Sequence, residues 1–329
     1  MARRYAFRGQ EKIGTYIKET LEKKGYLLEE NLEDADLIFT YCTSQTALED
    51  AYYDSDGIMQ LAHEGAVLID LSPATPQFAK ELNALSQIND FNQVSAPVIL
   101  DSAFDHDALS ADGYITCFMG GDEKACDAAR PVLEELVSHI ELMPTAAEAA
   151  LAKAVYTLQL SAQVVATIEA DALYRACSER SLGMSAAGQV GAVSPLAQNV
   201  LAAIHDEKFE STYTVEICMA ELVAAITAAD DADLILPHAE AAMHILELLA
   251  IVGGIDLSPL AMSLLYGDEE ACERHGLDWS RAQEAYGSDS DGSSAAMPHL
   301  HNHDDEDFDD FDSYDDSDYA DGMGGYSEN

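Results

Sequence analysis

The stretch AFRGQEKIG, residues 6–14, decides the fold of the first half of the chain. A short apolar run precedes Gly9, and a helical pattern follows it as far as Lys24. In the pattern G-x-G-x-x-G, the first glycine makes the turn from a strand into a helix, and the third lets strand and helix pack closely. Because Gly9 and Gly14 hold these two positions, the stretch predicts a strand, a tight turn and a helix.

The second position of this pattern is Glu11. A glycine there allows the backbone to approach a pyrophosphate at the helix N-terminus. Glu11 instead brings a side chain and a negative charge, which repels a phosphate. Arg8 and Lys12 are the neighbouring cations that could offset this charge in part. The stretch alone leaves open whether the turn binds a dinucleotide or is kept only for folding.

Outward from this stretch, short β-like runs alternate with amphipathic helical runs as far as Leu142. Such alternation predicts a parallel sheet covered by helices. The expected strands are 4–7, 35–41, 66–70, 94–98, 114–119 and 139–142, and the expected helices are 12–24, 46–60, 76–86 and 124–137. Only 11 residues separate Gly25 from Leu37, too few for a complete strand, helix and strand, so we expect a shortened sheet.

From Thr145 the pattern becomes helical throughout. Ala, Leu and Glu at helical spacing continue for about 35 residues, which predicts one long helix. Further helices are expected at 196–206, 213–230 and 238–252. We therefore expect three parts: a Rossmann-like α/β domain (1–143), an all-α domain (144–285) and a disordered acidic tail (286–329), whose Ser, Asp, Gly and Tyr cannot form a core.

Charge and cysteine content narrow the class of protein. The 329 residues carry a net charge of -45, which argues against binding to nucleic acid or to anionic membranes. The six cysteines form no C-x-x-C pair and lie in apolar segments, which indicates buried free thiols in a reducing compartment, the cytoplasm. Because no uncharged apolar run is long enough to span a bilayer, we expect neither secretion nor membrane insertion.

Six features occur in one order along residues 4–270 and together resemble the β-hydroxyacid dehydrogenase family, which includes 3-hydroxyisobutyrate dehydrogenase and relatives of 6-phosphogluconate dehydrogenase. They are ADLIFT (35–40), IDLSPATP (69–76), SAPV (95–98), the strand-turn-helix 113–133, Lys153, and Leu236-Pro237 with Gly253-Gly254. The resemblance implies a Rossmann-like domain joined by a long interdomain helix to an all-α domain. It also implies NAD or NADP as cofactor and a small hydroxy acid, or its semialdehyde, as substrate.

The same resemblance implies a set of site residues. Lys153 matches the lysine that transfers a proton during hydride transfer, and Thr157 stands where the family has an asparagine. The residues implied to bind the cofactor are Arg8, Gly9, Gly14, Thr43 and Ser72, and those implied to meet the substrate are Pro97, Val98 and Ile99. A lysine acts as general acid or base when burial or a nearby cation brings its pKa toward neutrality. The alternative for Lys153 is a stem packed on the helix flank with the ammonium in solvent.

The sequence departs from the family at three further places. Residues 147–150 replace a Gly-x-Gly-Gln segment before the lysine. Residues 99–101, Ile-Leu-Asp, replace the Ser-Gly-Gly that receives the substrate carboxylate. Ala220-Glu221 replaces a Lys-Asp pair, so the cofactor-facing lysine is absent. These departures weaken the recognition of both an anionic substrate and the cofactor.

Three functions follow as hypotheses. The first is a divergent NAD(P)-dependent dehydrogenase or reductase, and the second is a non-catalytic relative, a pseudoenzyme, that binds another ligand or a protein partner. The third is divalent-metal binding by His299, His301 and His303 with the acids that follow, against the alternative of a tail that binds ions weakly or not at all. The alanine-rich faces of 146–176 suit close helix contacts, and we expect a homodimer.

Overall fold

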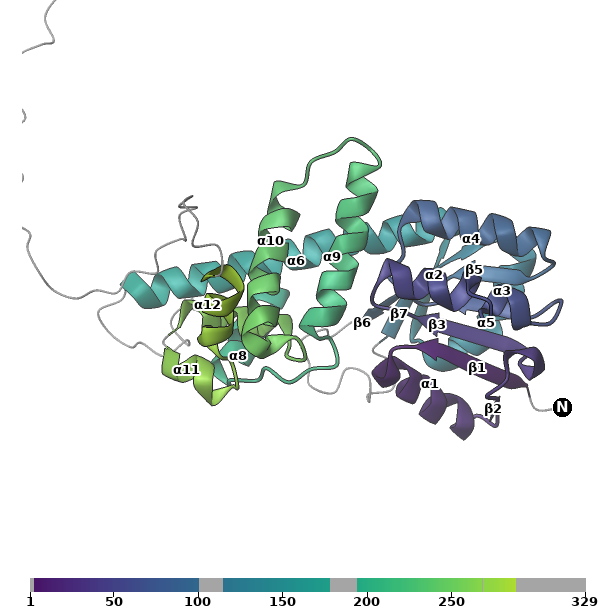
Figure 1. Ribbon diagram of the computed structural model, residues 1–329, viewed down its shortest axis with the longest axis horizontal. Coiled ribbons are helices and arrows are strands. Elements are labelled where there is room, and N and C mark those ends of the chain that lie inside the picture. Colours follow the sequence, from purple (N-terminus) through teal and green to yellow (C-terminus); the bar gives the residue numbers. More distant parts are fainter. Residues whose placement is uncertain (1–2, 101–114, 178–193, 268, 288–329) are drawn as a thin grey trace, which may run out of the picture. The chain divides into compact units, whose positions relative to one another are not determined.

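The computed structural model describes residues 3–100, 115–177, 194–267 and 269–287, which belong to one compact unit extending to residue 288 (Figure 1). Within these ranges no helix combines the length and the apolar character needed to cross a membrane. All six cysteines are free, and five are buried as predicted. Cys177 is exposed, which corrects the prediction, because it ends a long helix whose last three residues all face solvent. The predicted metal candidates His299, His301 and His303 lie outside the described residues.

An eight-stranded sheet forms the first half, in the order β2-β1-β3-β4-β5-β7-β6 with β8 beside β7. The strands are β1 (Arg4–Gly9), β2 (Leu27–Leu28), β3 (Leu37–Tyr41), β4 (Val67–Asp70), β5 (Asn92–Ser95), β6 (Val98–Leu100), β7 (Ile115–Gly121) and β8 (His139–Met143). The five strands from β2 to β5 are parallel, as predicted, whereas β7 is antiparallel to β5 and β6. The predicted strand 94–98 divides in two, because Pro97 has no N–H to donate to the ladder.

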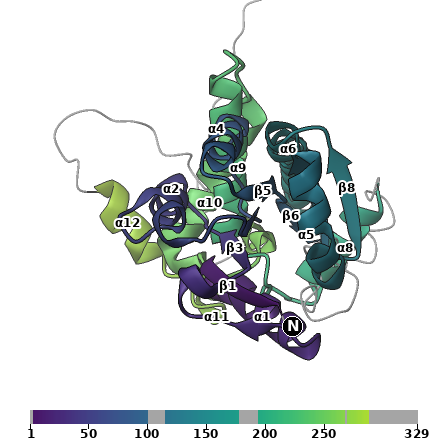
Figure 2. The same cartoon turned by 90° about the vertical axis from the view of Figure 1, so that its right-hand side faces the viewer.

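Helices cover both faces of the sheet, so the interior strand β3 is buried along its whole length. Leu37 and Phe39 pack in one cluster with α1 (Glu11–Lys23) and α5 (Glu123–Leu136). Ile38 packs in a second cluster with residues of α2 (Gln45–Tyr53), α3 (Ile58–Leu61) and α4 (Pro76–Ile88). Figure 2 shows α2 and α4 on one side of the sheet and α5 on the other. The predicted helix 46–60 is thus two helices, because the chain turns between Asp54 and Gly57, whose N–H donates to the Asp54 carbonyl at 2.9 Å.

The crossover from α1 to β3 is as short as predicted. β2 has only two residues, both exposed, and it pairs with β1. A single 3₁₀ turn, η1 (Leu32–Asp34), then leads to β3. The sheet therefore lacks a full second strand and the crossover helix at this edge.

From Ala146 onward the described elements are helices, with one isolated bridge between Glu210 and Leu257. They are α6 (Ala146–Cys177), α8 (Pro195–His205), α9 (Val215–Asp230), α10 (Pro237–Leu249), the π-helical turn η2 (Ala250–Gly254), the 3₁₀ helix η3 (Pro259–Tyr266), α11 (Glu269–Arg274) and α12 (Trp279–Gly287). The long helix is confirmed as α6, whereas η3, α11 and α12 were not predicted. A division into two domains near residue 143 stays a prediction.

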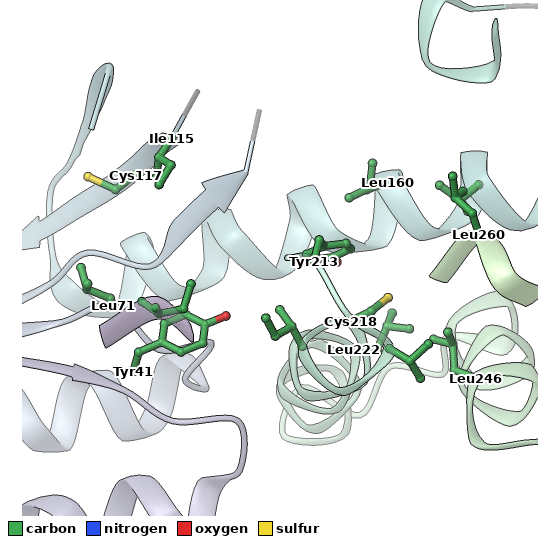
Figure 3. Close-up of a cluster of buried hydrophobic side chains, with 14 of the residues drawn as sticks. Tyr41, Leu71, Ile115, Cys117, Leu160, Tyr213, Cys218, Leu222, Leu246 and Leu260 are labelled. Carbon is green, nitrogen blue, oxygen red and sulfur yellow. The ribbon is translucent and has the colours of Figure 1, made fainter. Parts of the chain in front are cut away.

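One apolar cluster runs from the sheet into the helical half. Figure 3 shows Tyr41 and Leu71 from the sheet side of this cluster, and Tyr213, Cys218 and Leu222 from the side of α9. The carboxyl ends of β3 and β4 therefore face α9, and Thr43 and Ser72, two of the predicted cofactor residues, follow these strand ends.

Candidate functional site

The turn between β1 and α1 needs glycine at both ends. Gly9 has φ +124°, and a Cβ on it would stand 1.9 Å from the carbonyl oxygen of Tyr41. The next N–H, of Gln10, donates to that same oxygen at 2.8 Å. A Cβ on Gly14 would stand 2.6 Å from the ring of Phe7, so α1 packs directly on β1. Gly9 thus makes the turn and Gly14 the close packing, the two roles that the spacing predicts.

The start of α1 is occupied by the chain's own side chain. The side-chain oxygen of Gln10 accepts from the Ile13 N–H at 3.1 Å, and Glu11 is the exposed first residue of the helix. The guanidinium of Arg8 donates to the Phe7 carbonyl at 3.2 Å. A pyrophosphate at this helix N-terminus would have to displace the Gln10 cap and lie beside a carboxylate.

Lys153 and Thr157 lie one turn apart on α6, and the structure joins both to Glu221 of α9. Lys153 Nζ lies 2.6 Å from Glu221 Oε1, and the Thr157 hydroxyl donates to Glu221 Oε2 at 3.0 Å. The Tyr213 hydroxyl donates to the same Oε2 at 2.9 Å. Because all four side chains are buried, Lys153 does not reach solvent, which rules out the alternative of an ammonium in water.

Burial and carboxylates set the chemistry around this network. Burial, reinforced by the charge of Glu221, raises the pKa of the Tyr41 hydroxyl well above its usual value. Burial and then Glu221 also raise the pKa of the Cys218 thiol to about 12. Both groups stay protonated at neutral pH. Neither Tyr41 nor Cys218 therefore adds a charge beside the Lys153–Glu221 ion pair.

Thr43 and Ser72 follow β3 and β4 at the carboxyl edge of the sheet, where dinucleotides bind in open α/β sheets. The Thr43 hydroxyl donates to Glu216 Oε1 on α9 at 2.8 Å. Ser72 Oγ accepts from the Cys42 N–H at 3.0 Å, and the Ser72 N–H donates to Asp70 Oδ1 at 3.1 Å. Both predicted cofactor residues are at the expected edge, and each is already engaged by protein groups.

Pro97, Val98 and Ile99 lie elsewhere on the sheet. Val98 and Ile99 belong to β6 and pair with β7, and Val98 lines a small apolar cavity beside Leu71 and Leu133. Of the described hydrogen bonds and ion pairs, none joins these three residues to the Lys153 network. Their role in meeting a substrate stays a prediction.

Sequence reasoning missed two members of the network, Glu221 and Tyr213. Glu221 stands out in the sequence only as a replacement in the family's Lys-Asp pair, and this was the available signal that a carboxylate faces Lys153. Tyr213 lies in the loop between α8 and α9 and has no such signal. Among the described residues, no group of His, Cys, Asp and Glu could hold a metal ion.

The sequence of this chain is similar to that of known oxidoreductases. A family model described as the NAD binding domain of 6-phosphogluconate dehydrogenase matches residues 7–144. An uncharacterized oxidoreductase of Bacillus subtilis is 25% identical over 156 residues, which cover 46% of this chain and 52% of that protein. A probable 3-hydroxyisobutyrate dehydrogenase of Mycobacterium bovis is 29% identical over 157 residues, which cover 48% of this chain and 49% of the relative. The chain spans about half the length of these curated relatives.

The likeness of the folds extends further along the chain. The solved structure of Mycobacterium tuberculosis 3-hydroxyisobutyrate dehydrogenase with L-serine has a TM-score of 0.62 and 20% identity. The match covers 82% of this chain and all of that one. At this identity the match shows a shared fold: a Rossmann-like α/β half followed by a helical half, as predicted.

Proposed function

Because the chain belongs to the β-hydroxyacid dehydrogenase family, we propose that it is a divergent NAD(P)-dependent oxidoreductase acting on a small hydroxy acid or its semialdehyde. The observation that carries the proposal is the buried Lys153, held on α6 at 2.6 Å from Glu221. In this position the ammonium can hold a proton for a substrate oxygen, or return it, while the nicotinamide, when bound, supplies the hydride chemistry.

Glu221 acts in this proposal as a positioning residue. Its Oε1 binds Lys153, and its Oε2 is fixed by the hydroxyls of Thr157 and Tyr213. A carboxylate with both oxygens engaged holds the ammonium in one place, as general acid and base catalysis requires. Thr157 then supports Glu221, in place of the substrate contact that the family's asparagine makes.

The fit of a dinucleotide to the turn after β1 is partial. Gly9 and Gly14 provide the turn and the packing, and Thr43 and Ser72 lie at the expected edge. Glu11 and the side chain of Gln10 occupy the place of the pyrophosphate. If NAD or NADP binds, its adenosine side meets a strand of only two residues, Leu27–Leu28.

A second candidate is a non-catalytic relative that keeps the fold and binds another ligand or a protein partner. The Gln10 cap on α1 favours it, because the Ile13 N–H at the helix N-terminus already has an acceptor without a phosphate. The shortened sheet favours it too. In this case Lys153 and Glu221 serve as a structural ion pair.

Calorimetric titration with NADH and NADPH at low salt separates the two candidates. For the oxidoreductase we expect binding by the wild type, and about tenfold tighter binding by Glu11→Gly, which removes a like charge. Glu19→Gln, a change on an exposed face of the same helix, should leave the affinity unchanged. Lys153→Met should keep nucleotide binding and abolish turnover. Failure of both the wild type and Glu11→Gly to bind either nucleotide would overturn the oxidoreductase and favour the second candidate.

A further inference from the structure

A cleft of about 470 Å³ lies between α9 and the loops that follow β3 and β4. Pockets for small organic ligands range from roughly 300 to 1,000 Å³, so the cleft has the size of a binding site. On the side of α9, the apolar lining is formed by Met219, Val223 and Ala224, together with Ile255. The side that follows β3 and β4 contributes Phe78 and the hydroxyl and amide groups of Thr43, Ser44, Gln45, Thr75 and Gln77.

All the ionic groups that line the cleft are negative. They are Glu49, Glu81, Glu216 and Asp231, and the described lining includes no lysine or arginine. The ion pairs of the described residues leave these four carboxylates without a cationic partner. A cleft lined by charges of one sign concentrates ions of the opposite sign.

Three of these carboxylates are held in place by neutral donors. Thr43 donates to Glu216 at 2.8 Å, and Gln45 Nε2 donates to Glu49 at 2.9 Å. Gln77 Nε2 donates to Glu81. A neutral donor orients a carboxylate without cancelling its charge. The cleft therefore presents fixed negative charge beside an apolar wall.

This arrangement suits an organic cation better than a metal ion or an anion. No three His, Cys, Asp or Glu side chains of the described residues come close enough to hold a metal ion, so the carboxylates are spread along the cleft. An apolar wall adds affinity for a ligand with hydrocarbon surface. A phosphate or carboxylate ligand would be repelled by the uncompensated charges.

We propose that the cleft binds an organic cation, an ammonium or guanidinium group carried on an apolar body. The site is separate from the Lys153 network, because Glu221 lies on the buried side of α9 while Glu216, Ala220 and Ala224 face the cleft. Thr43 lines this cleft and is also a predicted cofactor residue, so the two proposals share one residue, but the cation does not require a bound dinucleotide.

Three six-carbon probes with different head groups test the charge preference. Hexylammonium, hexanol and hexanoate share one chain, and calorimetry of the full chain at low salt measures their affinities. We expect hexylammonium to bind about tenfold tighter than the other two, with the difference shrinking as salt screens the charges. With ¹³C-methyl methionine, the signal of Met219 on the cleft wall should shift on binding, and that of buried Met262 should not.

A matched set of variants tests the location. Glu49→Gln/Glu81→Gln/Glu216→Gln should remove the preference for hexylammonium, and Glu134→Gln, exposed on α5 and outside the cleft, should retain it. Should the triple variant not fold, Glu81→Gln alone should lower hexylammonium affinity at least about twofold. Equal binding of the three probes, no binding of hexylammonium, or an unchanged preference in the glutamine variants would overturn the proposal. Hexylammonium binding without NADH binding would overturn only the oxidoreductase, and the converse would overturn only this inference.

Discussion

Lys153 and Glu221 form a pair whose side chains are 6% and 3% exposed. Removal of one partner from a buried pair leaves an uncompensated charge and costs roughly 3–5 kcal/mol. We therefore predict a loss of this size in the free energy of unfolding for Lys153→Met, measured by urea denaturation. The double variant Lys153→Met/Glu221→Gln should recover most of it, because glutamine still accepts from Thr157 and Tyr213.

The matched control for this prediction is an exposed ion pair. Lys208 Nζ lies 3.1 Å from Asp206, and both side chains are more than half exposed. Lys208→Met should cost at most about 1 kcal/mol. An equal loss for Lys153→Met and Lys208→Met would show that the Lys153 pair contributes no more than a surface contact.

Asp70 should make stability depend on pH. It is fully buried, its Oδ1 accepts from Thr40 and from the Ser72 N–H, and burial raises its pKa from 3.8 to about 6. A carboxyl with a higher pKa in the folded state stabilises the fold below the unfolded pKa, and this contribution is lost as the pH rises through the folded pKa. Relative to Asp70→Asn, the wild type should lose roughly 2 kcal/mol of unfolding free energy between about pH 4 and pH 6.5.

Urea denaturation across this pH range measures the effect of Asp70. Asp50→Asn, on the exposed face of α2, provides the comparison and should track the wild type at every pH. A constant difference between Asp70→Asn and the wild type from pH 4 to 6.5 would contradict the pKa shift at Asp70.

At the scale of single residues, the sequence pointed to Lys153 and Thr157 as candidate site residues because both align with positions of the family pattern on one recognisable helix. The partner that the structure gives them, Glu221, lies on α9, 64 residues beyond Thr157. Helical periodicity describes which residues share a face, but it carries no information about which side chains meet across two helices. The buried ion pair between Lys153 and Glu221 therefore could not be predicted from the sequence and is known only from the structure.

The β1–α1 turn is the element whose geometry is most constrained. Alanine at Gly9 would combine a left-handed φ with a Cβ 1.9 Å from the Tyr41 carbonyl, so we predict a loss above about 3 kcal/mol in unfolding free energy for Gly9→Ala. Gly25 also has a positive φ, +83°, but open space around it, and Gly25→Ala should cost only about 1 kcal/mol. Thermal unfolding of both variants measures the difference. Similar losses of unfolding free energy would show that the Tyr41 carbonyl can move away from the added Cβ at little cost.

Periodicity predicted those elements whose pattern is simple. The short apolar run of β3 predicted a strand, and the helical spacing of apolar residues along α6 predicted a long helix. The segment Pro259–Tyr266 forms η3, in which every residue except Tyr266 is buried. A segment that is apolar on all sides has no amphipathic period, so nothing in its sequence distinguished helix from strand. The short crossover 26–36 was predictable for another reason, since chain length alone excludes a full strand and helix.

At the scale of the whole molecule, the fold places the cleft and the excess of acidic residues sets its charge. The net charge of -45 is reflected in a cleft whose described ionic groups are all carboxylates. Glu11 adds a further carboxylate at the turn after β1, which is the place where dinucleotide-binding folds hold a pyrophosphate. A shared backbone fold therefore does not fix the ligand, because side chains at the carboxyl edge of the sheet set the sign of the charge that a ligand meets.

The apolar face of α6 leads to a prediction about assembly. Leu151 and Val155 lie one turn apart and are 48% and 46% exposed, although their neighbours Ala150 and Ala154 are buried. Because exposed apolar side chains on one face favour association, we predict a homodimer, with twice the mass of one chain by light scattering.

Leu151→Glu/Val155→Glu should give the mass of a single chain, since charges would be buried in the contact. Leu85→Glu/Ile88→Glu changes two exposed residues of α4 in the same way and should leave the dimer intact. A wild type with the mass of one chain would exclude the dimer, and dissociation by the α4 variant would move the contact from α6 to α4.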